Sequence, residues 1–357
     1  MKRSFGPDAV RAAAAVGVLS VHFYLNSGFY ELPVAGGVMT ASTALRMAFL
    51  TAVPMFLMLS GWLCCHQTWT PRYYLRLLPV LLTYLVCSAG CLVFRRFYLG
   101  EEIVFLGALR RILEFPAAPY SWYIEMYIGL FLLQPLLNAG FSALPERGKL
   151  ALTVSLFAIT SLPLVTNSVY HILPAWWTNF YPVAYYILGA YLREKPLRCR
   201  SGWLWLGWLG VAAVHAAVQR WLYPGEPMVI TALVSRGGPG VFVESLCLFS
   251  LLMRSDDARA PRAWQWIVRR IAALSLPMYL LSYITARLLS PRLAAAVPDG
   301  VRRQLVLPLA VLLNLVDSGV LAQLCEWLTA GLQALLPQKW KYHSSGSSVQ
   351  APEKQKN

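Results

Sequence analysis

Apolar runs of about 17–25 residues recur along almost the whole chain, with short polar segments between them. A helix needs about 20 apolar residues to cross the hydrocarbon core of a bilayer, so each run can span a membrane. The pattern predicts an all-α fold, a polytopic bundle of transmembrane helices. The ten expected spans lie near residues 9–27, 43–65, 77–94, 121–142, 149–166, 178–193, 202–221, 238–253, 268–289 and 305–336.

Three of the apolar runs need separate interpretation. The run at 305–336 is longer than a span requires, and we expect it to tilt or to continue as an interfacial helix. The run at 226–236 is ambiguous and is compatible with a short re-entrant piece. The first run resembles a signal peptide, but charged residues stand at its start and nine spans follow, which favours a retained helix.

The distribution of basic residues sets the expected orientation. If the N-terminus is cytoplasmic, the basic residues of the inner side outnumber those of the outer side by two to one. We therefore expect both termini in the cytoplasm, with residues 1–340 as one membrane domain and 341–357 as a polar, disordered tail. The net charge of +15 then indicates topology and contact with anionic lipid head groups rather than nucleic acid.

The composition restricts where any chemistry takes place. The chain is 57% hydrophobic and only 13% charged, about half the charge of a soluble protein. We expect no soluble catalytic domain fused to the spans, and therefore expect the protein to act within or at the membrane. None of the seven cysteines forms a Cys-x-x-Cys pair, and we expect no metal site.

Arg11 and His22 are eleven residues apart in the first span. At about 100° per residue they fall on nearly the same helical face, roughly 16 Å apart along the axis. Ionisable groups in a lipid-spanning helix are costly and usually face the bundle interior. An imidazole that accepts protons, with a fixed cation below it, suggests chemistry on an anionic substrate. The alternatives are an Arg11 that reaches the head groups and a His22 that only packs.

Asp8, Arg72 and Arg76 lie at inner helix entries. Asp8 suits a helix N-terminus because it offsets the helix dipole, and it can pair with Arg11 at i, i+3. Arg72 and Arg76 are at i, i+4, which would turn both guanidiniums the same way, an arrangement suited to phosphate groups. Anchoring to the inner head groups explains the two arginines equally well.

Two further motifs occur at the second and fourth spans. Ser60 precedes Gly61, and this pair permits close helix approach in lipid; a nucleophilic serine would need a nearby base. Trp122 and Tyr123 enter the fourth span from the outer side. Aromatic residues at that position fit an interfacial belt, and they also fit a platform on which a sugar ring stacks.

Taken in order, these motifs resemble the acyltransferase-3 family of bacterial integral membrane O-acyltransferases, in the sub-branch that modifies polysaccharides. The resemblance covers roughly residues 4–336. Many members carry a Glu about five residues after the fourth-span Trp, where this chain has Tyr127. The matching motifs are Asp8-x-x-Arg11 with His22, Phe56-x-x-x-Ser60-Gly61, Arg76-Leu-Leu-Pro79, Ser121-Trp122-Tyr123-Ile124, Ile187-Leu-Gly189 and Ser275-Leu-Pro-Met-Tyr279.

The resemblance implies transfer of an acyl group, acetyl by default, from cytoplasmic acyl-coenzyme A to a hydroxyl of a cell-envelope or lipid-linked glycan. Acetyl-coenzyme A would then be the donor, and the protein would lie in the bacterial inner membrane. Arg11, Arg72 and Arg76 would hold the coenzyme A phosphates, and His22 would act as general base. Trp122 and Tyr123 would line the acceptor path, with Asp8 and Ser60 in supporting roles.

Two other functions stay open at this point. A transporter or flippase of glycan intermediates would also contain spans with Gly, Pro and isolated acids, but it predicts inverted repeats, and none is visible. A non-catalytic assembly partner predicts that Arg11 and His22 tolerate substitution. For the enzyme, a covalent acyl-histidine is the competing mechanism.

Overall fold

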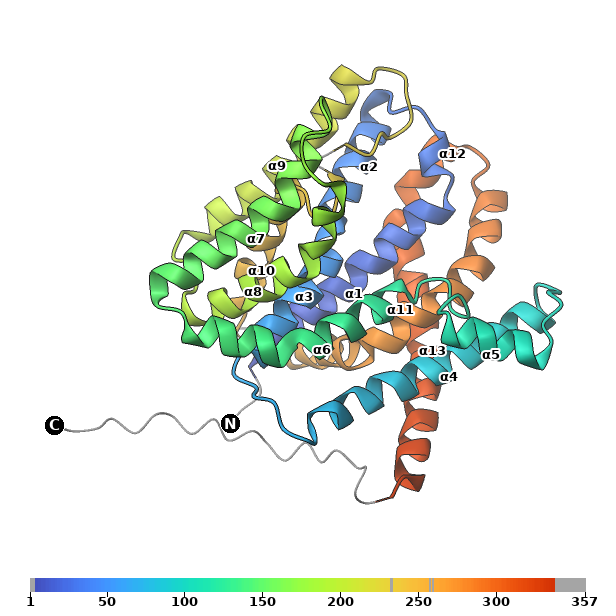
Figure 1. Ribbon diagram of the computed structural model, residues 1–357. Coiled ribbons are helices and arrows are strands. Elements are labelled where there is room, and N and C mark those ends of the chain that lie inside the picture. The colour runs from blue at the N-terminus through green and yellow to red at the C-terminus, as the bar shows by residue number, and fades with distance from the viewer. Residues whose placement is uncertain (1–3, 232–233, 257, 259, 338–357) are drawn as a thin grey trace.

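The computed structural model describes residues 4–231, 234–256, 258 and 260–337, and this part of the chain contains helices and no strand (Figure 1). Within these described ranges, eight helical stretches are long and apolar enough to cross a membrane. They are Phe5–Asn26 (α1), Gly36–Cys64 (α2 and α3), Tyr73–Phe97 (η3 and α4), Trp122–Ala143 (α6), Glu146–Thr166 (α7), Ser201–Leu222 (α9), Arg262–Ala296 (α11) and Gly300–Leu335 (α12 and α13).

The other two predicted spans also form helices, but shorter ones. They are α8, Tyr181–Glu194, and α10, Pro239–Met253. Most residues of α8 are buried, and α10 packs on α9 and α1, so protein rather than lipid surrounds much of both helices. A helix enclosed in this way does not need the full length of a span. The fold is therefore the expected polytopic bundle, with every predicted span helical.

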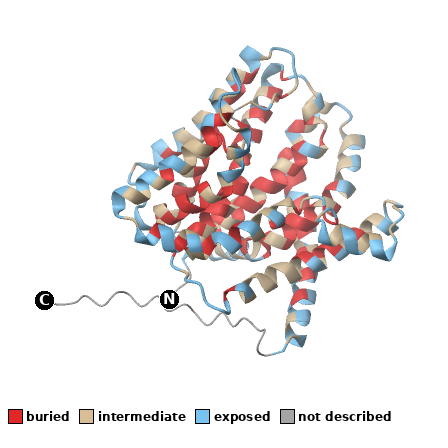
Figure 2. Ribbon diagram, viewed as in Figure 1, coloured by how far each residue is buried: buried red, intermediate tan, exposed pale blue. Residues whose placement is uncertain are grey.

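Helix α1 lies at the centre of the bundle. It contacts α3 (Ala52–Cys64), α10, α11 and α13 (Leu307–Leu335), and buried residues concentrate along it (Figure 2). Its small residues allow this packing: a Cβ at Gly17 would lie 3.1 Å from that of Ala52. The central position explains why α1 can carry ionisable side chains, because they face protein instead of lipid.

Helices α3 and α8 cross at two glycines. A Cβ added to Gly61 would lie 1.9 Å from the carbonyl oxygen of Tyr186, and one added to Gly189 would lie 1.9 Å from that of Met58. The backbones of the two helices are thus in direct contact, a packing that small residues permit in membranes. The expected packing role of Gly61 is confirmed, and the crossing fixes Ser60 beside it.

Helix α5, Phe105–Leu113, was not expected from the sequence. It has no buried residue and extends away from the bundle with the outer end of α4 (Leu78–Phe97) (Figure 1). Nine residues are too few to span a membrane, so the search for long apolar runs cannot find it. Its surface joins exposed Phe105 and Leu106 with a basic last turn, a composition typical of interfacial helices.

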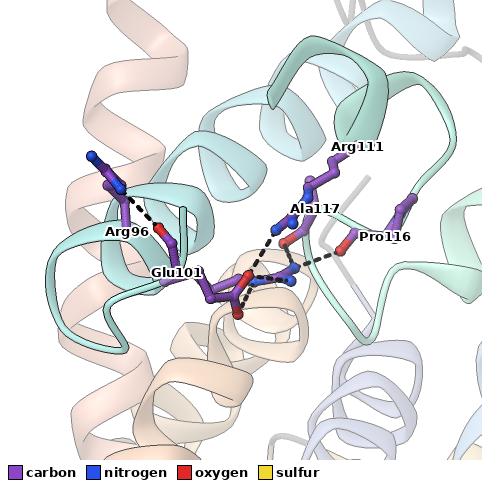
Figure 3. A network of polar contacts seen from close by, with 6 residues as sticks. Arg96, Glu101, Arg111, Pro116 and Ala117 are labelled. Carbon is purple, nitrogen blue, oxygen red and sulfur yellow. Dashed lines mark hydrogen bonds and ion pairs between the residues drawn. The ribbon is translucent and has the colours of Figure 1, made fainter. Parts of the chain in front are cut away.

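A polar network ties the end of α4 to the end of α5 and to the turn before α6 (Figure 3). Arg95 bonds both oxygens of Glu101, at 2.9 and 2.8 Å, and Arg111 reaches the same carboxylate at 2.8 Å. Arg95 also donates to the carbonyl oxygen of Pro116 at 2.9 Å. The network therefore holds the connection that leads to Tyr120.

The run at 226–236 joins α9 to α10 and folds inward at the outer end of the bundle. The N–H of Val34 donates to the carbonyl of Glu226 at 2.8 Å, and Met228 is buried. Residues 232–233 of this run lie outside the described residues, as does the polar tail 341–357, and the re-entrant piece considered from the sequence stays a prediction. The start of α1 and the end of α13 lie at the same, lower end in Figure 1; we call it the inner end, following the predicted orientation.

Candidate active site

A cavity of about 190 Å³ opens in the inner half of the bundle. Arg11, Ser60 and Tyr123, three residues selected from the sequence, line it together. They come from α1, α3 and α6, so the cavity is formed by the association of helices distant in the chain. Its other walls include Val18, Phe56, Tyr127, Ser275 and Tyr279.

His22 lies just beyond the upper end of this cavity. Val18, one helical turn below His22 on α1, and Tyr279 on α11 close that end. The imidazole is 5% exposed and lies between two rings: Tyr120 stacks on it with centroids 3.7 Å apart, and the centroid of Tyr279 is 5.8 Å away. The rings fix the plane of the imidazole.

The hydrogen bonds of Ser282 assign the tautomer of His22. Nδ1 of His22 lies 3.0 Å from the Ser282 hydroxyl, which donates its one proton to the carbonyl oxygen of Tyr279, 2.7 Å away. The serine oxygen therefore accepts from the imidazole, so Nδ1 carries the proton and Nε2 keeps a lone pair. An imidazole in this form can take a proton from a hydroxyl group.

A second, smaller pocket borders His22 from the outer side. Its volume is about 20 Å³, and Asn26, Ser290, Arg303 and Asn314 contribute polar groups to its lining. About 10–15 Å³ is needed for one water, so the pocket has room for little more than one. His22 thus separates an inner cavity from an outer pocket.

Tyr120 is held against His22 from several directions. Asn26 Nδ2 bonds its hydroxyl at 3.1 Å, and Tyr279 donates to its carbonyl oxygen. The turn before it begins at Phe115, whose φ of 68° lies in the left-handed region and whose carbonyl accepts from Ser121. This turn places the tyrosine ring over the imidazole.

Arg76 is partly buried near the inner cavity, although it does not line it, and its charge acts with that of Arg11 on Tyr127 of the cavity wall. Arg72 is exposed. The prediction that the two guanidiniums lie on one helical face is wrong, because Tyr73–Leu77 form a 3₁₀ helix (η3). At three residues per turn, positions four apart differ by about 120°, instead of the roughly 40° of an α-helix.

The remaining candidates occupy separate positions. Asp8 is buried at the inner start of α1. Trp122 does not line the inner cavity; the guanidinium carbon of Arg236 lies 4.2 Å above its ring. Ser60 donates to the carbonyl oxygen of Phe56 at 2.9 Å, and its hydroxyl is not beside His22. Glu125 is exposed, and Tyr127 faces the cavity in its place.

Ser282, Tyr120, Arg46 and Arg236 were not selected as site residues from the sequence. Ser282 is 260 residues from His22, and no local spacing reveals such a pairing. A signal did exist for Arg46, since a charged residue within an apolar run points to an interior role.

Comparison with protein families identifies the chain. The model of an acyltransferase domain matches residues 5–322, which is nearly the whole described bundle. The chain belongs to the acyltransferase-3 family. The comparisons with curated proteins and with solved structures gave no match.

Family membership makes the protein a membrane acyltransferase, one that transfers groups other than aminoacyl groups. Its long apolar helices make it a multi-pass membrane protein. Acyl transfer explains the match to an acyltransferase domain, whereas a transporter that performs no chemistry would not. Among the described residues of the acyltransferase, no group of three His, Cys, Asp or Glu side chains is placed to hold a metal ion.

Proposed function

We propose that the acyltransferase moves a short acyl group, acetyl by default, from cytoplasmic acyl-coenzyme A to a hydroxyl of a cell-envelope or exported glycan. One observation carries the proposal. His22 stands between an inner cavity and an outer pocket with Nδ1 bonded to Ser282 and Nε2 left as a proton acceptor.

The inner cavity suits the donor. Coenzyme A carries phosphate groups at one end and the thioester at the other, joined by a narrow arm. Arg11 lines the cavity and Arg76 acts at the same place, so guanidiniums meet the phosphates at the inner end. Arg72, which is exposed, adds charge for the nucleotide part. The arm then runs along α1, and the distance from Arg11 to His22, roughly 16 Å, separates the anionic end from the reacting end.

The reaction at His22 is a displacement at the thioester carbonyl. Nε2 takes the proton of the acceptor hydroxyl as its oxygen attacks the carbonyl carbon, which forms the new C–O bond. The C–S bond then breaks, and the thiolate of coenzyme A takes the proton from Nε2. Tyr120 and Tyr279 exclude water around the imidazole.

The acceptor approaches from the outer side along the start of α6, where Trp122 lies outside the inner cavity and Tyr123 lines its wall, at the boundary between acceptor and donor. An aromatic surface there suits the apolar face of a sugar ring. A glycan or lipid-linked sugar at this level, with acyl-coenzyme A on the opposite side, corresponds to an enzyme of the bacterial cytoplasmic membrane.

The test compares the parent with His22→Ala in lipid nanodiscs, using labelled acetyl-coenzyme A and cell-envelope glycans. We expect transfer to fall at least about 100-fold, the usual contribution of a general base, with folding and insertion unchanged. His66→Ala removes an exposed imidazole and serves as the matched control. Transfer by His22→Ala at the rate of the control would reject the assigned role.

An acyl-histidine intermediate would use the same Nε2 as nucleophile. Incubation with labelled acetyl-coenzyme A in the absence of acceptor distinguishes the two mechanisms. A general base leaves no label on the protein after rapid denaturation, whereas label that depends on His22 would establish the covalent route.

A further inference from the structure

Arg46 is a buried cation outside the donor cavity, and no ion pair among the described residues includes it. Arg46, in the last turn of α2 (Gly36–Ala48), is 9% exposed. Its Nε donates to the Tyr30 hydroxyl at 2.5 Å, and its guanidinium carbon is 5.7 Å from the centre of that ring. Its Nη1 has no hydrogen-bond partner among the residues that the structure describes. A buried charge normally has an ion partner and all its donors satisfied, so this side chain presents an unused donor.

A second guanidinium acts on the first. Arg236 lies in the connection before α10, and its charge is within electrostatic range of Arg46. The connection is fixed, since Tyr185 donates to the carbonyl oxygen of Arg236 at 2.8 Å and Ser161 to that of Gly237 at 2.7 Å. In the described part of the chain, neither Arg46 nor Arg236 has a carboxylate at ion-pair distance. Two like charges held in proximity repel each other, and an anion between them would remove that cost.

Both arginines adjoin the surroundings of His22. The charge of Arg46 acts on His22, and that of Arg236 acts on Tyr279, the ring that closes the inner cavity. Arg236 also lies over Trp122, which belongs to the proposed acceptor path. The pair is therefore on the acceptor side of the imidazole, whereas Arg11 and Arg76 serve the donor side.

We propose that Arg46 and Arg236 bind an anionic group of the acceptor, so that the substrate is a sugar bearing a carboxylate or a phosphate. That this sugar is the acceptor of the acyl group rests on the proposed function. Guanidiniums bind such oxygen pairs through parallel hydrogen bonds. Trp122, beneath Arg236, offers an aromatic face to the ring that carries the anion. The anion would fix the sugar so that one hydroxyl faces Nε2 of His22.

Binding of three sugars to the full-length protein in nanodiscs tests the proposal. Glucuronate and glucose 6-phosphate each add an anionic group to the frame of glucose, and glucose is the neutral reference. We expect one or both anionic sugars to bind at least tenfold tighter than glucose, and the tighter one identifies the group. Equal affinities for all three sugars would overturn the proposal.

Two variants locate the site. Arg46→Gln and Arg236→Gln should each abolish the preference for the anionic sugar, while Arg220→Gln, which removes an exposed outer arginine, should keep it. Arg46→Lys restores the charge without the fork and should recover part of the preference, which separates loss of binding from misfolding. An unchanged preference in Arg46→Gln and Arg236→Gln would place the anion elsewhere.

Acetyl-coenzyme A affinity, measured on the same preparations, separates this inference from the proposed function. A protein that prefers the anionic sugar but does not bind acetyl-coenzyme A would retain the anion site and lose the donor assignment. A protein that binds and turns over acetyl-coenzyme A without any sugar preference would retain the donor assignment and lose the anion site.

Discussion

Ser282 accepts the Nδ1 proton of His22 across 260 residues of sequence, at a distance of 3.0 Å. The contact joins the first transmembrane helix to the middle of α11, the longest helix of the described chain. It gives the imidazole one tautomer, and its role is therefore one of positioning.

Replacing Ser282 by Ala should lower kcat roughly tenfold and leave the KM for acetyl-coenzyme A unchanged, because the imidazole can then rotate and exchange tautomers. Steady-state kinetics over a pH series would show both effects. Ser245→Ala, which removes a buried hydroxyl from α10, is the control. A kcat for Ser282→Ala equal to that of the control would contradict the positioning role.

Arg76 and Arg72 should differ in their effect on the donor. Arg76→Ala should weaken acetyl-coenzyme A binding about tenfold, since a charge-assisted hydrogen bond contributes about 1.5–3 kcal/mol. Arg72→Ala should have a smaller effect, because that side chain is exposed. Equilibrium binding at two salt concentrations would measure both. A larger effect for Arg72→Ala than for Arg76→Ala would show that the nucleotide binds on the exposed side of η3, where Arg72 lies.

Gly61→Ala should destabilise the protein by about 1–3 kcal/mol, the range for added volume in a packed core, because its Cβ would overlap the carbonyl oxygen of Tyr186. Gly129→Ala in α6 is the matched control, since no atom lies within 4 Å of its added Cβ. That change should be neutral or slightly stabilising. Thermal unfolding in one detergent compares the two, and equal melting temperatures would argue against the close crossing of α3 and α8.

The Glu101 network should depend on pH. Hydrogen bonds from Arg95 and Arg111 lower the pKa of the Glu101 carboxyl from its ordinary value near 4.5 to about 2. A lowered folded pKa stabilises the fold above the unfolded pKa, so the contribution is complete at neutral pH and is lost as the pH falls from about 4.5 to about 2.

Thermal unfolding of Glu101→Gln tests this dependence. The variant should melt below the parent at pH 7, and the difference should narrow as the pH approaches 3. Glu114→Gln, at an exposed i, i+4 pair with Arg110, controls for the loss of a surface carboxylate. A difference that stays constant down to pH 3 would exclude Glu101 as the titrating group.

The fold was largely predictable because lipid imposes a length on every spanning helix. That constraint identified all ten predicted spans, including α8 and α10, whose short helices are enclosed by protein. It could not reveal α5, since a helix of nine residues outside the bundle obeys no such requirement.

The site was predictable where one helix carries the pattern. The spacing of Arg11 and His22 is a property of α1 alone, and it placed both residues beside the inner cavity. The prediction that Arg72 and Arg76 share one face was wrong because the segment is a 3₁₀ helix. No local sequence pattern indicated that geometry. Ser282, Tyr120 and Arg236 depend on how separate helices pack, which no local pattern records.

The outer pocket beside His22 has room for little more than one water. If acyl-coenzyme A binds as proposed, its thioester would meet little water on that side. We then expect futile hydrolysis to be slow until a sugar enters, which would couple the consumption of the donor to the arrival of the acceptor.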